Sequence, residues 1–200
     1  MIIIDVGACV GEFTDFCLTE YPVEMIYLFE PLSANYNFLA NKYRTNKKVK
    51  IYKTAMSDFD GKANFYKKRY PQKTGEILFD FPGNAGSSLR RDKGSTSKKH
   101  FEVVQVIKLS TFLTMEKIKS IDILKIDVEG SEYAIMNDMI DNLLYQIIDK
   151  IYYEDHARKV AGIKKDKAEF VKKAKELGIL GKFYLQSALL KYVPAIKLFS

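Results

Sequence analysis

The sequence predicts an α/β protein with a doubly wound, mostly parallel sheet. Short apolar runs rich in β-branched residues alternate with amphipathic segments of helical period along most of the chain. The first run, residues 2–6, has almost no polar alternation, which is typical of a strand buried on both faces. Acidic residues stand at or just past the ends of several runs, at the edge where parallel strands form a ligand crevice.

The N-terminal run ends in a turn that contains two glycines. We expect a first strand at Ile2–Val6, a turn at residues 7–11 (GACVG), and a helix from residue 12 with apolar residues at helical spacing. Such a turn brings backbone N–H groups and a helix N-terminus up to a ligand. It is therefore the first candidate for a nucleotide-type cofactor site.

The remaining elements follow from the same patterns. Further strands are expected at residues 25–29, 49–55, 62–66, 101–108, 121–130 and 146–153, and one or two short ones within 183–199. Helices are expected at residues 33–43, from 110, at 131–144 and at 164–177. Residues 67–100 are irregular and rich in loop-forming residues, and a long insert of this kind is usually a lid or a mobile segment.

Length and composition suit a single domain over residues 1–200. No apolar run reaches membrane-spanning length, and no signal peptide is visible. Cys9 and Cys17 would lie too far apart on one helix to form a disulfide, so a cytoplasmic location is expected. Because Met1 lies directly on the first strand, we expect either an unusually trimmed domain or one cut from a longer polypeptide with adjacent domains.

The net charge of +7 comes mainly from lysines, many of them within residues 164–175. This excess fits a solvated lysine face. It also fits attraction to an anionic acceptor, such as nucleic acid, a nucleotide sugar or a membrane surface.

The first turn favours a sulfonium cofactor over a dinucleotide. Glu30 ends the second strand, 19 residues after Gly11, where a carboxylate can accept both hydroxyls of an adenosine ribose. NAD and S-adenosylmethionine both fit this. However, Ala8 and Cys9 stand where a pyrophosphate needs a close glycine, and Asp5 makes the turn anionic. A cationic ligand, whose own carboxylate would use free N–H groups of the turn, fits better.

Several motifs occur in one order and together resemble the FkbM family of S-adenosylmethionine-dependent O-methyltransferases. They are DVGACVG at residues 5–11, FEP at 29–31, AMSD at 55–58, GSSL at 86–89, KIDVEGSE at 125–132 and EDH at 154–156. The resemblance implies a class I, Rossmann-like methyltransferase fold and transfer to a hydroxyl, commonly of a sugar or a polyketide. It covers roughly residues 2–156, and residues 157–200 form a divergent C-terminal part.

The resemblance also implies cofactor-binding roles. Gly7 and Gly11 would line the methionine portion, Glu30 would hold the ribose, and Asp58 would accept a hydrogen bond from the adenine amine. The full candidate set is Asp5, Gly7, Ala8, Val10, Gly11, Glu30, Pro31, Ser57, Asp58 and Ser88.

An aliphatic hydroxyl, with a pKa of roughly 15, needs a general base, a metal or both before it attacks. The candidate catalytic residues are Lys125, Asp127, Glu129, Glu154 and His156. In one arrangement His156 takes the proton and an acid orients it. In the other, Asp127 and Glu154, with Asp155 or His156 as an optional further ligand, bind Mg²⁺ or Mn²⁺. Lys125 would neutralise the acids or contact the acceptor. Glu132 is expected to stabilise the N-terminus of a helix through the helix dipole and to take no part in the chemistry.

The sequence thus predicts an enzyme that methylates a hydroxyl of a sugar in a glycan or glycoconjugate. An RNA ribose 2′-O-methyltransferase shares this chemistry, but the basic tail is its only support. Nucleic acid is not an expected partner, since no basic groove with interleaved aromatic residues is evident. A NAD-dependent oxidoreductase is the alternative from another class.

Overall fold

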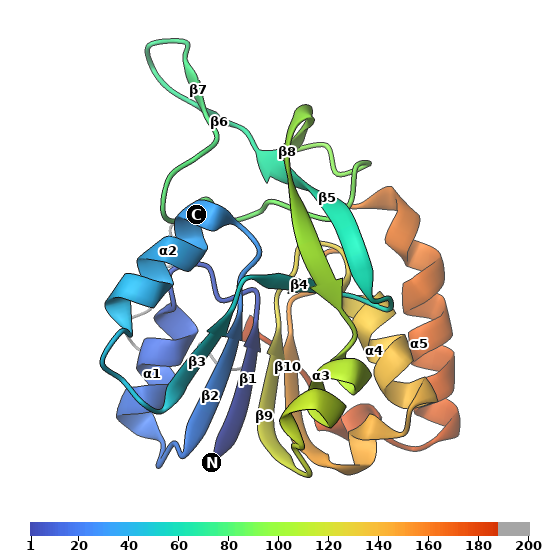
Figure 1. Cartoon of the computed structure of the whole chain (residues 1–200). Coiled ribbons are helices and arrows are strands. Elements are labelled where there is room, and N and C mark those ends of the chain that lie inside the picture. The colour runs from blue at the N-terminus through green and yellow to red at the C-terminus, as the bar shows by residue number, and fades with distance from the viewer. Residues whose placement is uncertain (188–200) are drawn as a thin grey trace.

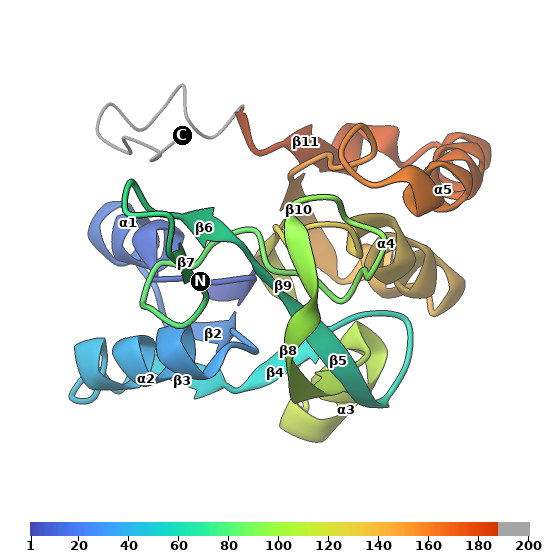
Figure 2. The same cartoon turned by 90° about the horizontal axis from the view of Figure 1, so that it is seen from above.

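A computed structural model describes residues 1–187 of the chain. Its centre is a six-stranded sheet in the order β11-β10-β9-β1-β2-β3, and every pairing in this sheet is parallel (Figure 1; β11 is labelled in Figure 2). The strands are β1 (Ile2–Val6), β2 (Met25–Phe29), β3 (Val49–Tyr52), β9 (Ile121–Ile126), β10 (Ile148–Tyr153) and β11 (Phe183–Leu185). The predicted α/β class with a parallel sheet is confirmed.

Helices cover both faces of this sheet (Figure 1). One face carries α1 (Glu12–Glu20) and α2 (Ser33–Lys42), and the other carries α3 (Leu109–Glu116), α4 (Glu132–Asp141) and α5 (Lys164–Glu176). Ile3 packs with the first pair of helices and Ile4 with the second group. Apolar contact on both faces explains why the β1 sequence is a nearly continuous apolar run.

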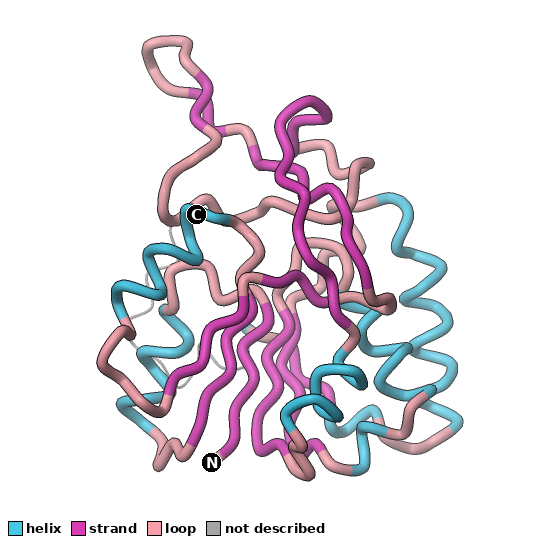
Figure 3. The backbone as a smooth tube through the Cα atoms, viewed as in Figure 1, coloured by secondary structure: helices cyan, strands magenta, loops and turns pink. Residues whose placement is uncertain are grey.

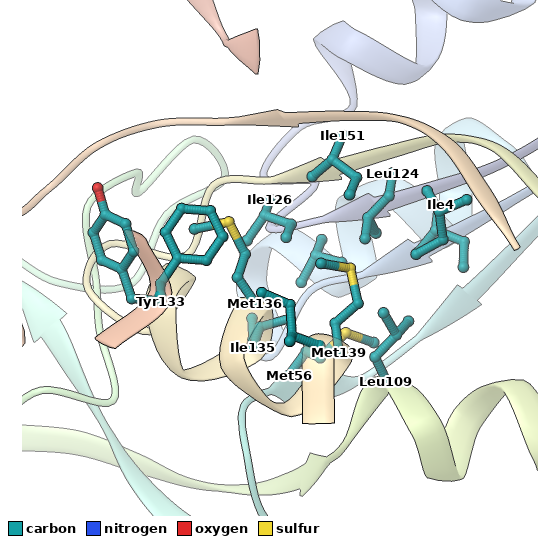
Figure 4. Packing of buried hydrophobic residues seen from close by; sticks show 14 of the residues in the cluster. Ile4, Met56, Leu109, Leu124, Ile126, Tyr133, Ile135, Met136, Met139 and Ile151 are labelled. Carbon is teal, nitrogen blue, oxygen red and sulfur yellow. The ribbon is translucent and has the colours of Figure 1, made fainter. Parts of the chain in front are cut away.

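The larger core lies between the sheet and helices α3, α4 and α5. Figure 4 shows Met136 and Met139 of α4 reaching toward Leu124 and Ile151 of the sheet. All four side chains are fully buried. Burial of each contributes roughly 1.5–3 kcal/mol to stability, so this core holds the strand ends of β9 and β10 in place.

A second, three-stranded sheet stands above the carboxyl ends of the central strands (Figure 3). It has the order β4-β8-β5, formed by β4 (Thr54–Met56), β5 (Gly61–Lys68) and β8 (Thr96–Ile107). The prediction of one strand over residues 49–55 is wrong: the chain leaves the central sheet after Tyr52 and joins the second sheet at Thr54. The predicted strand 101–108 begins earlier, because β5 pairs with β8 as far as Thr96.

The remaining segments are short. A two-stranded hairpin, β6 (Tyr70–Pro71) with β7 (Ile77–Leu78), lies within the irregular residues 67–100 and extends beyond the second sheet (Figures 1 and 2). Three single turns of 3₁₀ helix lie at Leu144–Gln146, Ala161–Ile163 and Leu180–Lys182. The strand predicted within 183–199 is β11, and residues 188–199 lie outside the described part. Among the helices of residues 1–187, none has the length and apolar character needed to cross a membrane.

Candidate functional site

A cavity lies at the carboxyl ends of β1, β2 and β9, with walls from both sheets. About 610 Å³ of space lies between its walls, including space that is open to solvent. Its lining comprises Val6, Gly7, Cys9, Phe29, Glu30, Pro31, Leu32, Thr54, Ala55, Met56, Phe65, Asn84, Ala85, Gly86, Ser87, Leu89, Asp127, Val128 and Glu129. The cavity therefore lies at the sheet edge where the sequence predicts a crevice.

Glu30 is fixed at the end of β2 by the backbone around it. One carboxylate oxygen accepts a hydrogen bond from the Cys9 N–H at 2.9 Å, and the other accepts one from the Leu32 N–H at 2.9 Å. The side chain is buried, and burial raises the pKa of Glu30 to about 7 although both N–H groups act to lower it. Each oxygen keeps further acceptor capacity, so the oriented carboxylate can still bind hydroxyl groups.

Gly7 allows the first turn to touch the end of β9. Its backbone has a φ of 82°, and a Cβ at this position would lie 1.8 Å from the carbonyl oxygen of Asp127. No side chain fits there. The close approach brings the residues after β1 and β9 into one wall of the cavity.

Four N–H groups of the first turn already have hydrogen-bond acceptors within the protein. The N–H groups of Gly7 and Ala8 both donate to the carbonyl of Phe29, at 3.0 and 3.1 Å, and that of Gly11 donates to the carbonyl of Ala8 at 2.7 Å. The N–H of Cys9 donates to Glu30. The expectation that these groups are free for a cofactor carboxylate is wrong, because the turn uses them to fix its own shape.

Asp5 and Lys125 form a buried pair behind the cavity wall. Asp5 accepts a hydrogen bond from the Thr14 hydroxyl at 2.9 Å and lies 3.1 Å from Lys125 Nζ. The ammonium also donates to the carbonyl of Gly7 at 2.8 Å and lies 3.8 Å from an Asp127 oxygen. Burial opposes the charge on Lys125, but Asp5 and Asp127 outweigh it and raise its pKa. Lys125 is therefore a positioning cation for Asp127.

Asp127 follows β9 and lines the cavity. Burial raises the pKa of its carboxyl to about 6, Lys125 opposes this rise, and Glu154 adds to it. Asp127 thus has a nearby cation on one side and the acids of the next strand end on the other.

Glu129 is held on the cavity wall by residues of the irregular segment 67–100. Its backbone has a φ of 59°, an uncommon conformation for a residue with a side chain. The Ser88 hydroxyl donates to its carbonyl at 2.7 Å, and the buried Lys93 ammonium lies 2.5 Å from its carboxylate. Lys93 also donates to the carbonyl of Gly86. Both contacts fix the direction in which Glu129 points.

His156 is fully buried among three carboxylates. Nδ1 lies 2.8 Å from Glu132, and Nε2 lies 3.1 Å from both Glu129 and Glu154. Burial opposes protonation of the ring, but the contacts with Glu132 and Glu154 outweigh it and raise the pKa of His156 to about 10. The prediction that His156 takes the hydroxyl proton therefore needs a ring that has first lost its own proton, whereas the unliganded geometry favours the charged ring.

Glu132 is a structural partner of this histidine. It has no exposed surface and accepts hydrogen bonds from the N–H groups of Val128, at 3.2 Å, and Gly130, at 3.0 Å, as well as contacting His156. The expectation of a helix-dipole role alone is wrong, because the side chain turns back into the loop before α4.

Residues 5–178 match the profile of the methyltransferase FkbM domain. The chain belongs to the FkbM methyltransferase family. It is also similar to "Methyltransferase 1" of Beauveria bassiana (strain ARSEF 2860), with 28% identity over 162 residues. The aligned region covers 74% of this chain and 64% of that relative, so the chain spans less than two thirds of the relative's length. No solved structure is significantly similar.

Only some of the cofactor-binding residues suggested by the FkbM motifs line the cavity. Gly7, Glu30 and Pro31 line the cavity, whereas its lining does not include Asp5, Ala8, Val10, Gly11, Ser57, Asp58 or Ser88. Ser57 is buried with its hydroxyl 3.1 Å from Asp58, which is exposed. Residues 54–56 line the cavity in their place.

The candidate catalytic residues also fall into two groups, those that line the cavity and those behind its wall. Asp127 and Glu129 line the cavity. Lys125 contacts Asp127 and His156 contacts Glu129 from behind, and Glu154 contacts His156. Cavity-lining residues that are neither acidic nor glycine, such as Cys9 and Asn84, were not predicted from the sequence. Lys93, which no motif marks within the irregular segment, was not predicted either.

Proposed function

We propose that this FkbM-family chain is an S-adenosylmethionine-dependent O-methyltransferase that acts on a sugar hydroxyl in a glycan or glycoconjugate. The main support is one cavity that combines a fixed carboxylate at Glu30 with two further carboxylates, Asp127 and Glu129. The strands that carry them, β2 and β9, flank β1. Glu30, which we assign to the ribose of the cofactor, is therefore separated from the acids that we assign to the methyl acceptor.

The lining suits the proposed cofactor. The two oxygens of Glu30 suit the vicinal hydroxyls of a ribose, and Phe29, Met56 and Phe65 offer apolar surface for a base. Asp127 and Glu129 favour a positively charged group in the same cavity. When bound, the cofactor supplies a methyl group on a cationic sulfur.

The chain's own residues would prepare the acceptor. Transfer to oxygen requires that the hydroxyl align with the methyl group and lose its proton. We assign hydrogen bonding of the acceptor hydroxyl and receipt of its proton to Asp127 and Glu129. Lys125 and Lys93 hold these two carboxylates in the unliganded protein, so little reorganisation is needed when an acceptor arrives.

Calorimetry with S-adenosylhomocysteine and with NADH tests the cofactor assignment. We expect saturable binding of S-adenosylhomocysteine and weaker or no binding of NADH. Preferred binding of NADH would overturn the proposal and support an oxidoreductase. Methyl transfer to RNA ribose, with none to saccharides, would support the proposed O-methylation but show that the acceptor is RNA rather than a glycan.

A further inference from the structure

Asp127, Glu129 and His156 bring three potential ligand atoms together at the edge of the cavity. One oxygen from each acid and one ring nitrogen all lie within 4.8 Å of one another. We propose that these three residues bind one divalent transition-metal ion, such as Mn²⁺ or Zn²⁺. Bonds of about 2.1 Å to one ion place its ligands about 3–4 Å apart, so a small side-chain adjustment completes the set.

The ring nitrogen Nε2 of His156 is the observation that separates this cluster from an ordinary group of acids. It is buried, and no group in residues 1–187 makes a well-directed hydrogen bond to it. It nevertheless lies 3.1 Å from Glu129 and from Glu154. The 3.1 Å separation from Glu129 also fits two neighbouring ligands of one ion, whereas Glu154 lies outside the three-residue set.

The opposite side of the ring has the support that a metal-binding histidine requires. Nδ1 lies 2.8 Å from Glu132, which is itself held by backbone N–H groups of the preceding loop. Metal-binding histidines usually donate their second ring N–H to such a carboxylate, which fixes the ring and strengthens the ligand. Glu132 is therefore assigned as the positioning residue of this site.

The fixed charges around the ring leave a negative excess. The carboxylates are Asp5, Asp127, Glu129, Glu132 and Glu154, and the lysines that face them are Lys93, Lys125 and Lys159. Metal binding would release the proton of the ring, since a ligating imidazole must be neutral, and with the ring neutral the carboxylates exceed the lysines by two. One divalent ion balances this excess.

The donor set selects the class of metal. Carboxylate oxygens suit Mn²⁺ and Mg²⁺, while an imidazole nitrogen suits transition metals. A mixed set of two carboxylates and one imidazole therefore favours a transition metal over Mg²⁺. The predicted pair of Asp127 with Glu154 is replaced, because Glu154 is half-exposed, contacts Lys159 and lies outside the three-residue set.

The proposed ion lies next to the place that the proposed function assigns to the acceptor hydroxyl, and only this role rests on that function. Binding is testable without methyl transfer. Titration of the full chain with Mn²⁺, followed by calorimetry and by the electron paramagnetic resonance of Mn²⁺, should reveal one bound ion per chain. His156→Ala and Asp127→Asn should each abolish or strongly weaken binding, and Glu132→Gln should weaken it about 10- to 100-fold.

His100→Ala is the matched control, because His100 is exposed and bonds to Ser97 outside the cluster. It should bind Mn²⁺ as the parent chain does. If His156→Ala fails to fold, Asp127→Asn decides. No saturable binding of Mn²⁺ or Zn²⁺, or equal affinity in Asp127→Asn and the control, overturns the inference. Retained S-adenosylhomocysteine binding in those samples would leave the proposed cofactor in place.

Discussion

At the residue scale, Glu30 is an acid that is oriented before any ligand arrives. Backbone N–H groups from the first turn and from the residues after β2 hold one carboxylate oxygen each. A carboxylate that cannot rotate loses little conformational entropy when it accepts two hydroxyl groups. The position was predictable from sequence, since an acid at the end of the second strand of such a sheet faces the crevice.

Glu30→Gln should weaken binding of S-adenosylhomocysteine by roughly 10- to 100-fold, because a neutral amide replaces an ionised acceptor. Isothermal titration calorimetry gives the affinity directly. Glu24→Gln, an exposed acid before the opposite end of the same strand, is the control and should bind normally. Equal affinity in both variants would remove Glu30 from the cofactor site.

Cofactor affinity should also depend on pH through Glu30. Burial raises the pKa of this carboxyl to about 7, so it is protonated below that pH and fully able to accept hydrogen bonds above it. Affinity for S-adenosylhomocysteine should rise several-fold between about pH 6 and about pH 8. Glu30→Gln should lose this rise, and a rise of the same size in that variant would contradict the assignment.

The first turn shows why other residue roles could not be predicted. Its glycine pattern is visible in the sequence, but the partner of two of its N–H groups is the carbonyl of Phe29, on another strand. Likewise, Asp5 looks available to a ligand until its partner Lys125 is known. Both cases depend on pairings between residues distant in the sequence.

At the element scale, the close approach of β1 and β9 depends on Gly7. A side chain there would meet the Asp127 carbonyl and would also have to adopt a positive φ. Gly75 has a similar φ of 85° with nothing within 4 Å of its added Cβ. The two positions therefore separate the cost of backbone conformation from the cost of the clash.

Gly75→Ala should lower the free energy of unfolding by about 1–2 kcal/mol, the cost of the left-handed conformation alone. Gly7→Ala should lower it by clearly more, since the backbone of two strand ends must separate. Urea denaturation measures both. Equal losses would show that the contact with Asp127 does not constrain the turn.

The irregular segment 67–100 contacts both sides of the cavity. On the Glu30 side, Asn35 of α2 bonds to the backbone of Gly83 and Asn84. On the other side, Ser88 bonds to the Glu129 carbonyl and Lys93 to its carboxylate. The sequence predicted an insert here, but a loop composition does not indicate which residues anchor it.

Lys93→Met should destabilise the protein by roughly 3 kcal/mol, because it leaves the Glu129 carboxylate without its buried cation. Lys98→Met, an exposed lysine of the same segment, should change stability by less than about 0.5 kcal/mol. The comparison again uses urea denaturation. A small effect at both positions would mean that solvent replaces Lys93 at Glu129.

At the scale of the whole molecule, the order of strands and helices follows from local patterns, because burial on both faces of a strand leaves an apolar run in the sequence. The split of residues 49–55 between two sheets leaves no such mark. The contacts of His156 leave no such mark either. Its motif locates it at a strand end with Glu154 beside it, but the sequence does not show that the ring also reaches Glu129 and Glu132, after the neighbouring strand.

The central proposal, methyl transfer to a sugar hydroxyl, is tested most directly with isotope-labelled S-adenosylmethionine and a panel of mono- and oligosaccharides. We predict label in a sugar methyl ether, lost in Asp127→Ala and retained in Asp149→Ala, whose exposed side chain lies outside the cavity lining. Cofactor binding without label on any saccharide hydroxyl, or unchanged turnover in Asp127→Ala, would contradict the account.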